Sequence, residues 1–173
     1  MLKVDQPQLI TERLVLRKLG ITDWEVVQFL RSDSGVNRYV DRPETPTKEE
    51  AIAFIEKICD GIDNRRCYYW VLCTKDNPEM IGSICLWNFA LDVTSAEVGY
   101  DLHPTHQGKG YMKEALEAIC NFSFDILQLT HIEAYTHKDN IASRKLLEKQ
   151  GFILQEGKTD PGFPHNIVYR LAP

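Results

Sequence analysis

The stretch Gln107-Gly108-Lys109-Gly110-Tyr111-Met112 decides how this chain folds. It follows a strand-like segment, residues 96–102, and leads into residues 112–122, whose apolar side chains recur every three or four positions, as on the buried face of a helix. A helix N-terminus carries unpaired N–H groups and a partial positive charge, and glycines let the backbone approach a ligand closely. The stretch therefore predicts an anion-binding turn at the start of a helix, and it indicates an enzyme.

Two common phosphate-binding fingerprints do not fit this stretch. A P-loop needs a glycine where His103 stands and a serine or threonine where Gly110 stands. The dinucleotide fingerprint needs a third glycine where Lys113 stands, and no early strand-turn-helix unit precedes the stretch. The anion must be held by a different kind of turn.

The stretch resembles the Gln/Arg-x-x-Gly-x-Gly/Ala signature of the GCN5-related N-acetyltransferases (GNATs), whose backbone amides cradle the pyrophosphate of acetyl-coenzyme A. Gln107 and Gly110 match the signature, whereas Met112 is bulkier than the residue that the family prefers. We expect the Met112 side chain to point away from the cofactor, into the core. Lys109 either adds charge near the phosphates or is a solvated turn residue.

Three further matches, at the start, in the middle and late in the chain, resemble the ribosomal-protein N-acetyltransferase branch of this family, the RimJ/RimL type. Residues 11–17 followed by Asp23 are similar to its opening strand and first helix, residues 81–84 and 96–100 to its third and fourth strands, and residues 140–152 to its closing helix and the next strand. The resemblance implies a single-domain α/β (α+β) fold over residues 1–173. It implies a mixed, mostly antiparallel sheet of about seven strands with four helices, in which strands 4 and 5 are splayed apart.

Composition agrees with one ordinary globular domain. The chain has 173 residues, of which 43% are hydrophobic and 26% charged, and its net charge of -5 offers no general attraction for nucleic acid. Five cysteines without a Cys-x-x-Cys pair argue against a disulfide framework and a structural zinc site. His103 and His106 lack an evident third ligand, so we expect no metal.

Charged residues interrupt the apolar positions near the N-terminus, so no signal peptide or membrane span is expected, and the chain is expected to be cytoplasmic. The expected partners are acetyl-coenzyme A and an amine acceptor such as a ribosomal-protein N-terminus. No direct contact with nucleic acid or a membrane is expected, and the chain is expected to be a monomer or a homodimer.

Local signals predict where helices and strands begin. Thr22 with Glu25, and Thr47 with Glu50, form capping boxes that start the first two helices. The first helix is expected to bury Val26, Phe29 and Leu30, the second Ala51, Phe54, Ile55 and Ile58. Asn140 can cap the last helix and Gly151 can end it. Strands are predicted at residues 9–19, 68–73, 80–89, 97–102, 131–136, 152–156 and 167–171, with residues 67–102 an antiparallel meander and 131–136 a parallel neighbour of 97–102.

The resemblance places the pantetheine arm of the cofactor in the V between residues 97–102 and 131–136. A buried strand edge must find hydrogen-bond partners, and a chain of cofactor amides supplies them. The cofactor-binding residues implied by the resemblance are Asp101, Leu102, Gln107, Gly108, Lys109, Gly110, Tyr111, Met112, Asn140 and Ser143.

The implied chemistry is direct attack of a neutral amine on the thioester, which needs a base, an oxyanion donor and an acid for the departing thiolate. Glu97 is the candidate base, directly or through a water; its alternative is a solvated charge on a strand edge. Backbone amides near Asp101 and Leu102 are the implied oxyanion donors. Many relatives place a tyrosine where Leu147 stands, so Ser143 becomes the candidate acid.

Three functions remain open on this sequence. The first is an acyltransferase that moves an acetyl group to a protein N-terminal α-amine, of the ribosomal-protein type. The second is the same reaction on a small amine such as an aminoglycoside, a polyamine or an amino acid. The third is a non-catalytic acyl-coenzyme A sensor. An open groove would favour the first and a narrow, strongly acidic pocket the second, whereas turnover would eliminate the third.

Overall fold

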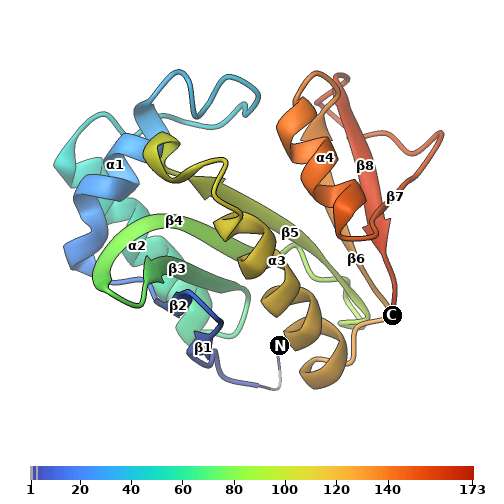
Figure 1. The fold of residues 1–173 in the computed structure, drawn as a ribbon, viewed down its shortest axis with the longest axis horizontal. Coiled ribbons are helices and arrows are strands. Elements are labelled where there is room, and N and C mark those ends of the chain that lie inside the picture. The colour runs from blue at the N-terminus through green and yellow to red at the C-terminus, as the bar shows by residue number, and fades with distance from the viewer. Residues whose placement is uncertain (1, 3) are drawn as a thin grey trace.

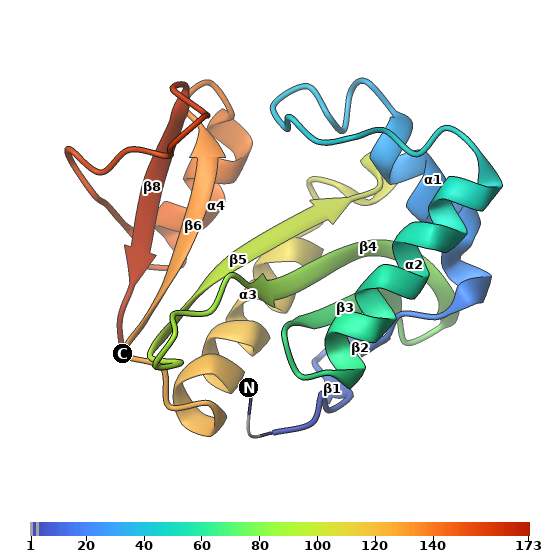
Figure 2. The same ribbon diagram turned by 180° about the vertical axis from the view of Figure 1, so that it is seen from behind.

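The chain folds into a single eight-stranded sheet with helices on both faces (Figures 1 and 2). This computed structural model describes residue 2 and residues 4–173. Helices α1 and α2 cover one face and α3 and α4 the other. The strands lie in the order β1-β2-β3-β4-β5-β6-β8-β7. The strands are β1 (Leu9–Ile10), β2 (Leu14–Lys18), β3 (Tyr68–Thr74), β4 (Asn77–Trp87), β5 (Ser95–Leu102), β6 (His131–His137), β7 (Ile153–Leu154) and β8 (Asn166–Leu171). The helices are α1 (Trp24–Ser32), α2 (Lys48–Asp63), α3 (Tyr111–Asn121) and α4 (Ile141–Lys149), with 3₁₀ turns at Ile21–Asp23 and Pro104–His106 and a π-helical turn at Phe122–Ile126.

The N-terminal strand differs from the prediction. Residues 9–19 form a hairpin of β1 and β2 rather than one strand, with Leu9 paired to Leu16. The Thr11 hydroxyl accepts the N–H of Leu14 and so turns the chain between the two strands. The hairpin accounts for the eighth strand. Leu14 and Leu16 are both fully buried, as their spacing indicates.

The start of α1 also differs, because Asp23 rather than Thr22 organises it. One oxygen of Asp23 accepts the N–H of Gly20 at 2.9 Å, and both oxygens accept from Arg17, at 2.9 and 2.7 Å. The Thr22–Glu25 capping box is therefore wrong, and the helix begins at Trp24. Its fully buried residues are Val27 and Leu30. Phe29 is not in the core but stacks on His103, with 4.5 Å between ring centroids.

The remaining helix signals are confirmed. Thr47 and Glu50 form the expected reciprocal capping box at α2. Asn140 caps α4 through its side-chain oxygen, and Gly151 follows that helix with a φ of +84°. Strands β3, β4 and β5 form the expected antiparallel meander, and β6 pairs with β5 in parallel.

Two apolar layers hold the helices against the sheet. The larger lies between the sheet and α3, and also takes in Leu147 of α4; the smaller lies between the sheet and α1 and α2. Alternation along β5 sends Ala96 and Val98 into the larger core, so Glu97, Gly99 and Asp101 lie on the opposite face, which carries α1 and α2. We call this second face the acceptor face.

Strands β5 and β6 separate soon after they meet. Their pairing covers only residues 95–97 with 131–133. Beyond that point β5 stays paired to β4 and β6 to β8, so the two strands diverge as a V (Figure 2). The expected splay between residues 97–102 and 131–136 is thus present, between β5 and β6.

Candidate active site

The glycine turn lies at the wide end of the V, where it starts α3. Gly108 and Gly110 have φ values of +73° and +82°, which a side chain would strain. A Cβ on Gly108 would meet nothing within 4 Å, so space is open beside the turn. Within the described part of the chain, no hydrogen bond uses the N–H groups of residues 108–110. These free N–H groups and the helix N-terminus fit a diphosphate such as that of coenzyme A.

Arg13, in the turn just before β2, contacts this glycine turn, a contact that the sequence did not reveal. Its guanidinium donates to the backbone oxygen of Lys109 at 2.9 Å and to Glu114 at 2.7 Å, and it lies over the Tyr111 ring at 4.7 Å. Burial acts to raise the pKa of Glu114, but hydrogen bonds from Thr11 and Arg13 outweigh it and lower the pKa. The sequence predicted that residues 11–17 resemble the opening strand of the family, but the contact of Arg13 with the glycine turn is visible only in the structure.

Gln107 and Met112 support the turn from inside. The Gln107 amide donates to the backbone oxygen of Leu102 at 2.9 Å, so it joins the turn to the end of β5. Met112 is 8% exposed and packs in the larger core, as expected. Both side chains therefore stabilise the turn from the protein side. The surface that the turn offers to a ligand consists of backbone atoms.

The backbone of β5 offers hydrogen-bonding groups to the V at alternate residues. His103 donates its N–H to Ile81 of β4, and the pairing continues with Asp101 opposite Ser83. In an antiparallel pair the bonded positions alternate, so the N–H of Asp101 faces β4 and the N–H of Leu102 faces the V. Of the two amides implied as oxyanion donors, only that of Leu102 is directed toward the V.

Glu97 lies at the closed end of the V on the acceptor face, opposite Glu133 in the parallel register. Burial raises its pKa above the usual range, although the amide of Asn88 donates to the carboxylate. No ion pair to Glu97 forms within residues 2 and 4–173. A carboxylate with a raised pKa and no bound cation suits a general base.

Asp101, by contrast, is fully engaged. One of its oxygens accepts from Ser83 at 2.6 Å and the other pairs with Arg42 at 3.1 Å. Arg42 also donates to Asn37 and to the backbone oxygen of Leu30, at 2.7 and 2.8 Å. This network ties the loop between α1 and α2, residues 33–47, to the end of β5.

Glu133 is the third carboxylate on this face, and it too is paired. Lys158 and Arg170 contact its oxygens at 2.5 and 2.7 Å. Burial acts to raise the pKa of Glu133, but these hydrogen bonds outweigh it and lower the pKa. Glu133 is thus a structural anion that joins β6 to β8 and to the segment before β8.

Helix α4 contributes Asn140 and Ser143 on the cofactor side of the V. The Asn140 side-chain oxygen accepts the N–H of Ser143 at 3.1 Å, and the Asn140 NH₂ group has no hydrogen-bond partner among the described residues. The Ser143 hydroxyl lies 2.8 Å from the hydroxyl of Tyr100 on β5. Leu147 is fully buried, so it supplies packing to α4. Sequence reasoning missed Tyr100. Because side chains alternate along a strand, Tyr100 lies on the same face of β5 as Val98, two residues before it.

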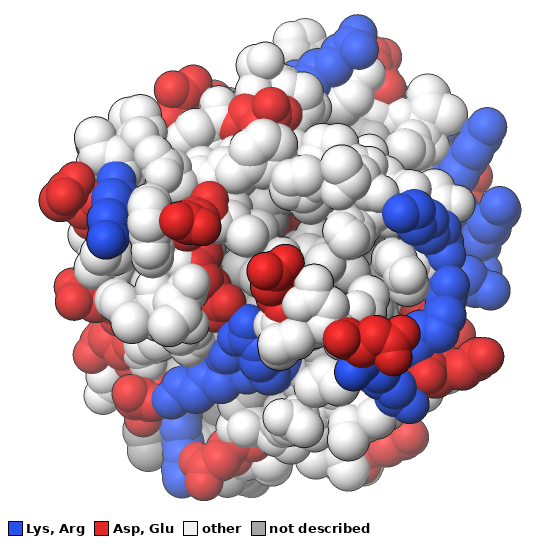
Figure 3. Space-filling view, turned by 60° about the vertical axis from the view of Figure 1, so that its left-hand side comes forward, with Lys and Arg blue, Asp and Glu red and all other residues white. Residues whose placement is uncertain are grey.

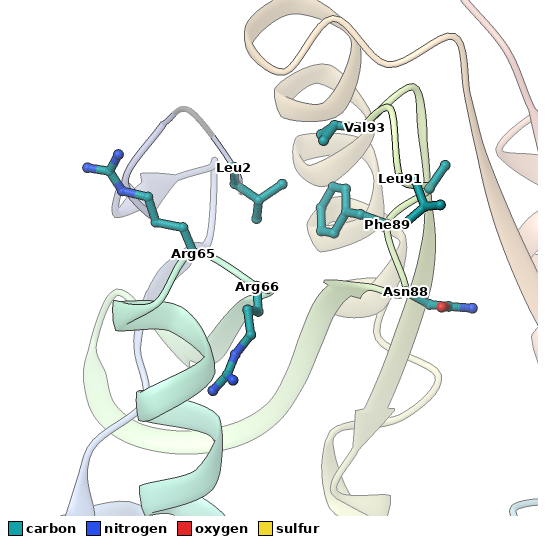
Figure 4. Close-up of a pocket in the computed structure, with 8 residues that line it drawn as sticks. Leu2, Arg65, Arg66, Asn88, Phe89, Leu91 and Val93 are labelled. Carbon is teal, nitrogen blue, oxygen red and sulfur yellow. The ribbon is translucent and has the colours of Figure 1, made fainter.

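A separate hollow of about 350 Å³ lies at the opposite end of β5 from the glycine turn. Its lining side chains come from the N-terminus, the end of α2 and the β4–β5 hairpin (Figure 4). Arg65 and Arg66 at its rim are paired with Asp5 and Asp60. Asn88 connects it to the candidate base, because its side chain binds Glu97.

No helix in the described part of the chain is long and apolar enough to cross a membrane.

Comparison with known proteins agrees with this geometry. The acetyltransferase (GNAT) domain model matches residues 13–153. The chain is 30% identical over 171 residues to the N-acetyltransferase YoaA of Bacillus subtilis, covering 96% of this chain and 97% of YoaA.

Solved structures give the same result. A protein of Vibrio cholerae named provisionally as a ribosomal-protein-serine acetyltransferase has a TM-score of 0.83 at 26% identity, over 99% of this chain and 100% of that one. The fold of RimL, a ribosomal L7/L12 α-N-protein acetyltransferase solved with coenzyme A, matches with a TM-score of 0.79 at 18% identity, over 95% and 96% of the two chains. A glycine turn at a helix start, a V with free backbone groups and these matches lead to one conclusion: the chain belongs to the GNAT family and is an acetyl-coenzyme A-dependent N-acetyltransferase.

Proposed function

We propose that this N-acetyltransferase acts on the α-amino group of a protein N-terminus, as enzymes of the ribosomal-protein type do. The observation that carries the proposal is the charge balance of the acceptor face. Of its three carboxylates on β5 and β6, Asp101 and Glu133 are neutralised by Arg42, Lys158 and Arg170, and only Glu97 of the three has no ion pair within the described residues.

A polycation such as a polyamine or an aminoglycoside needs several free carboxylates to bind it. The paired acids of β5 and β6 do not supply them. On the face turned toward the reader in Figure 3, basic side chains gather along the right edge and also lie among the acidic ones in the lower part of the view. The charge pattern therefore favours a monoamine acceptor over a polycation. The provisional name of the Vibrio cholerae neighbour supports the same acceptor class.

The proton balance supports an α-amine in particular. An α-amine has a reference pKa of about 7.7–8.0 and a lysine amine one of about 10.4, so the α-amine loses its proton far more readily near neutral pH. Glu97, with its raised pKa and no cation bound, accepts that proton directly or through a water. The amine then approaches from the acceptor face.

The remaining tasks fall to the V and to α4. Acetyl-coenzyme A, when bound, supplies the thioester. Residues 107–112 hold its diphosphate through their backbone, and the Asn140 NH₂ group binds the pantetheine arm. The N–H of Leu102 receives the developing oxyanion, and the Ser143 hydroxyl contacts the sulfur. Base and sulfur contact thus lie on opposite faces of β5.

Free thiol release from acetyl-coenzyme A tests the proposal. Paired peptides share one sequence with one internal lysine, and one member of each pair carries a blocked N-terminus. Release with the free peptide and not with the blocked one is the expected result. Release with the blocked peptide would indicate a lysine acceptor, and release only with spermidine, an aminoglycoside or a free amino acid would establish the small-amine alternative.

A further inference from the structure

A side-chain hydrogen bond bridges β5 and α4 on the cofactor side of the V. The phenol oxygen of Tyr100 lies 2.8 Å from the Ser143 Oγ. Both side chains are partly buried, and Tyr100 also packs against the larger core. Within the described part of the chain, neither hydroxyl has another hydrogen-bond partner. The two groups therefore orient each other.

Either hydroxyl can donate in this hydrogen bond, and the phenol is the better donor because it is more acidic than the serine hydroxyl. Burial raises the pKa of Tyr100 to about 12, so the phenol keeps its hydrogen near neutral pH. A serine hydroxyl has one hydrogen to donate and two lone pairs to accept with. When Tyr100 donates to Ser143, the hydrogen of Ser143 is left for a third group.

We propose that Tyr100 is a positioning residue: its hydroxyl donates to Ser143 Oγ and thereby directs the Ser143 hydrogen toward the sulfur of the bound thioester. The inference rests on the proposed contact of Ser143 with that sulfur. Without Tyr100, the Ser143 hydroxyl could rotate and donate to a backbone carbonyl of the preceding turn of α4, as helical serines often do.

This arrangement replaces a phenol on α4 with one on β5. Leu147 is fully buried and carries no donor, so the hydroxyl chemistry at this end of α4 comes from Ser143, oriented by Tyr100. Both donors remain neutral throughout the reaction. Tyr100 keeps its proton because its pKa exceeds that of a thiol, for which the reference value is about 8.5.

The reaction balances without a proton from Tyr100. The amine nitrogen forms the new C–N bond to the acetyl carbon, the C–S bond breaks, and its electron pair stays on sulfur. The Ser143 hydroxyl stabilises the thiolate by a hydrogen bond, and water supplies the proton that neutralises it. The amine proton leaves through the base.

A double-mutant cycle on the purified enzyme tests the inference. Tyr100→Phe is expected to lower kcat about three- to tenfold, the value of one hydrogen bond, with the KM and Kd for acetyl-coenzyme A unchanged. In the Ser143→Ala background the same substitution is expected to have no further effect on kcat. The matched control is Tyr169→Phe, which removes a hydroxyl that also binds α4, at Glu148, without touching Ser143. It is expected to keep the kcat of the native enzyme.

Each other outcome overturns a defined step. If Tyr100→Phe lowers kcat equally with and without Ser143, or leaves kcat unchanged while Ser143→Ala lowers it, Tyr100 does not act through Ser143. If Ser143→Ala alone has no effect on kcat, the sulfur contact in the proposed function is wrong, and this inference fails with it. Ser143→Thr keeps a hydroxyl, so its kcat is expected to remain sensitive to Tyr100→Phe; insensitivity would also refute the inference.

Discussion

The substitution Gly110→Asp separates the effect of charge at the glycine turn from the effect of strain. Gly110 is the N-cap of α3, with a φ of +82°. Any side chain in this left-handed region costs about 1–2 kcal/mol, less for Asp and Asn, which adopt it more readily. A Cβ here lies 3.3 Å from the Arg13 guanidinium, which is half-exposed and can move aside.

The carboxylate adds a charge next to the proposed diphosphate site. Two like charges about 4 Å apart repel by about 4 kcal/mol at an effective dielectric constant near 20, which corresponds to roughly a thousandfold in affinity. Screening by salt and the positive charge of Arg13 beside the new carboxylate reduce this figure, so we expect the Kd for acetyl-coenzyme A to rise about ten- to a hundredfold. The folded state should tolerate the charge, because an acidic N-cap interacts favourably with the helix dipole by about 0.3–1 kcal/mol.

The matched control is Gly110→Asn, which has the same size and the same tolerance of positive φ but carries no charge. Isothermal titration calorimetry with acetyl-coenzyme A, together with thermal unfolding, measures both effects. We expect Gly110→Asn to weaken binding far less than Gly110→Asp, and the two variants to unfold within a few degrees of each other. Equal affinities for the two variants would show that no phosphate lies beside this turn.

Other predictions concern the acceptor face. Glu97→Gln should lower kcat/KM most below the pKa of the amine, where a base is needed, and an unchanged pH profile would make Glu97 a structural charge. Burial raises the folded-state pKa of Glu97, so the folded chain loses stability as pH rises past the ordinary glutamate pKa, where the buried carboxyl must ionise. Glu97→Gln should therefore gain stability relative to the native chain as pH rises through this range, measured by urea unfolding, and a constant difference would contradict the raised pKa. Arg42→Ala should raise the KM of the acceptor more than that of acetyl-coenzyme A, since it releases residues 33–47 from Asp101; equal changes in both would refute a role of this loop at the acceptor side. Glu133→Gln leaves the partly exposed Lys158 and Arg170 without their buried partner and should lower the free energy of unfolding by about 2 kcal/mol. A loss below about 0.5 kcal/mol would mean that these two ion pairs contribute no more than solvent-exposed ones.

Local signals in the sequence predicted much of the fold because the groups involved are close along the chain. The Thr47–Glu50 box and the Asn140 cap satisfy helix ends within a few residues. The glycine turn likewise needs only its own backbone to take a positive φ. Where a distant partner competed, the prediction failed: Arg17 and the N–H of Gly20 engage Asp23, so α1 starts after that residue and not at Thr22.

The candidate site divides in the same way. Glu97, Ser143 and residues 107–112 are predictions from the family resemblance, and the structure adds which groups surround each of them. Tyr100 could not be identified, because its partner Ser143 is 43 residues away on another element. The arginine at position 42 lies in a loop without a motif, and its pairing with Asp101 spans 59 residues.

Sequence alone determined the family, the order of the elements and the glycine turn at the start of α3, because backbone conformation, helix capping and strand alternation depend on neighbouring residues. Tertiary structure decided which carboxylates remain unpaired, which amide of β5 faces the V and which hydroxyl orients Ser143. These properties depend on partners that come together only when the sheet and the helices pack, so burial and charge at the site follow from the fold and not from local spacing.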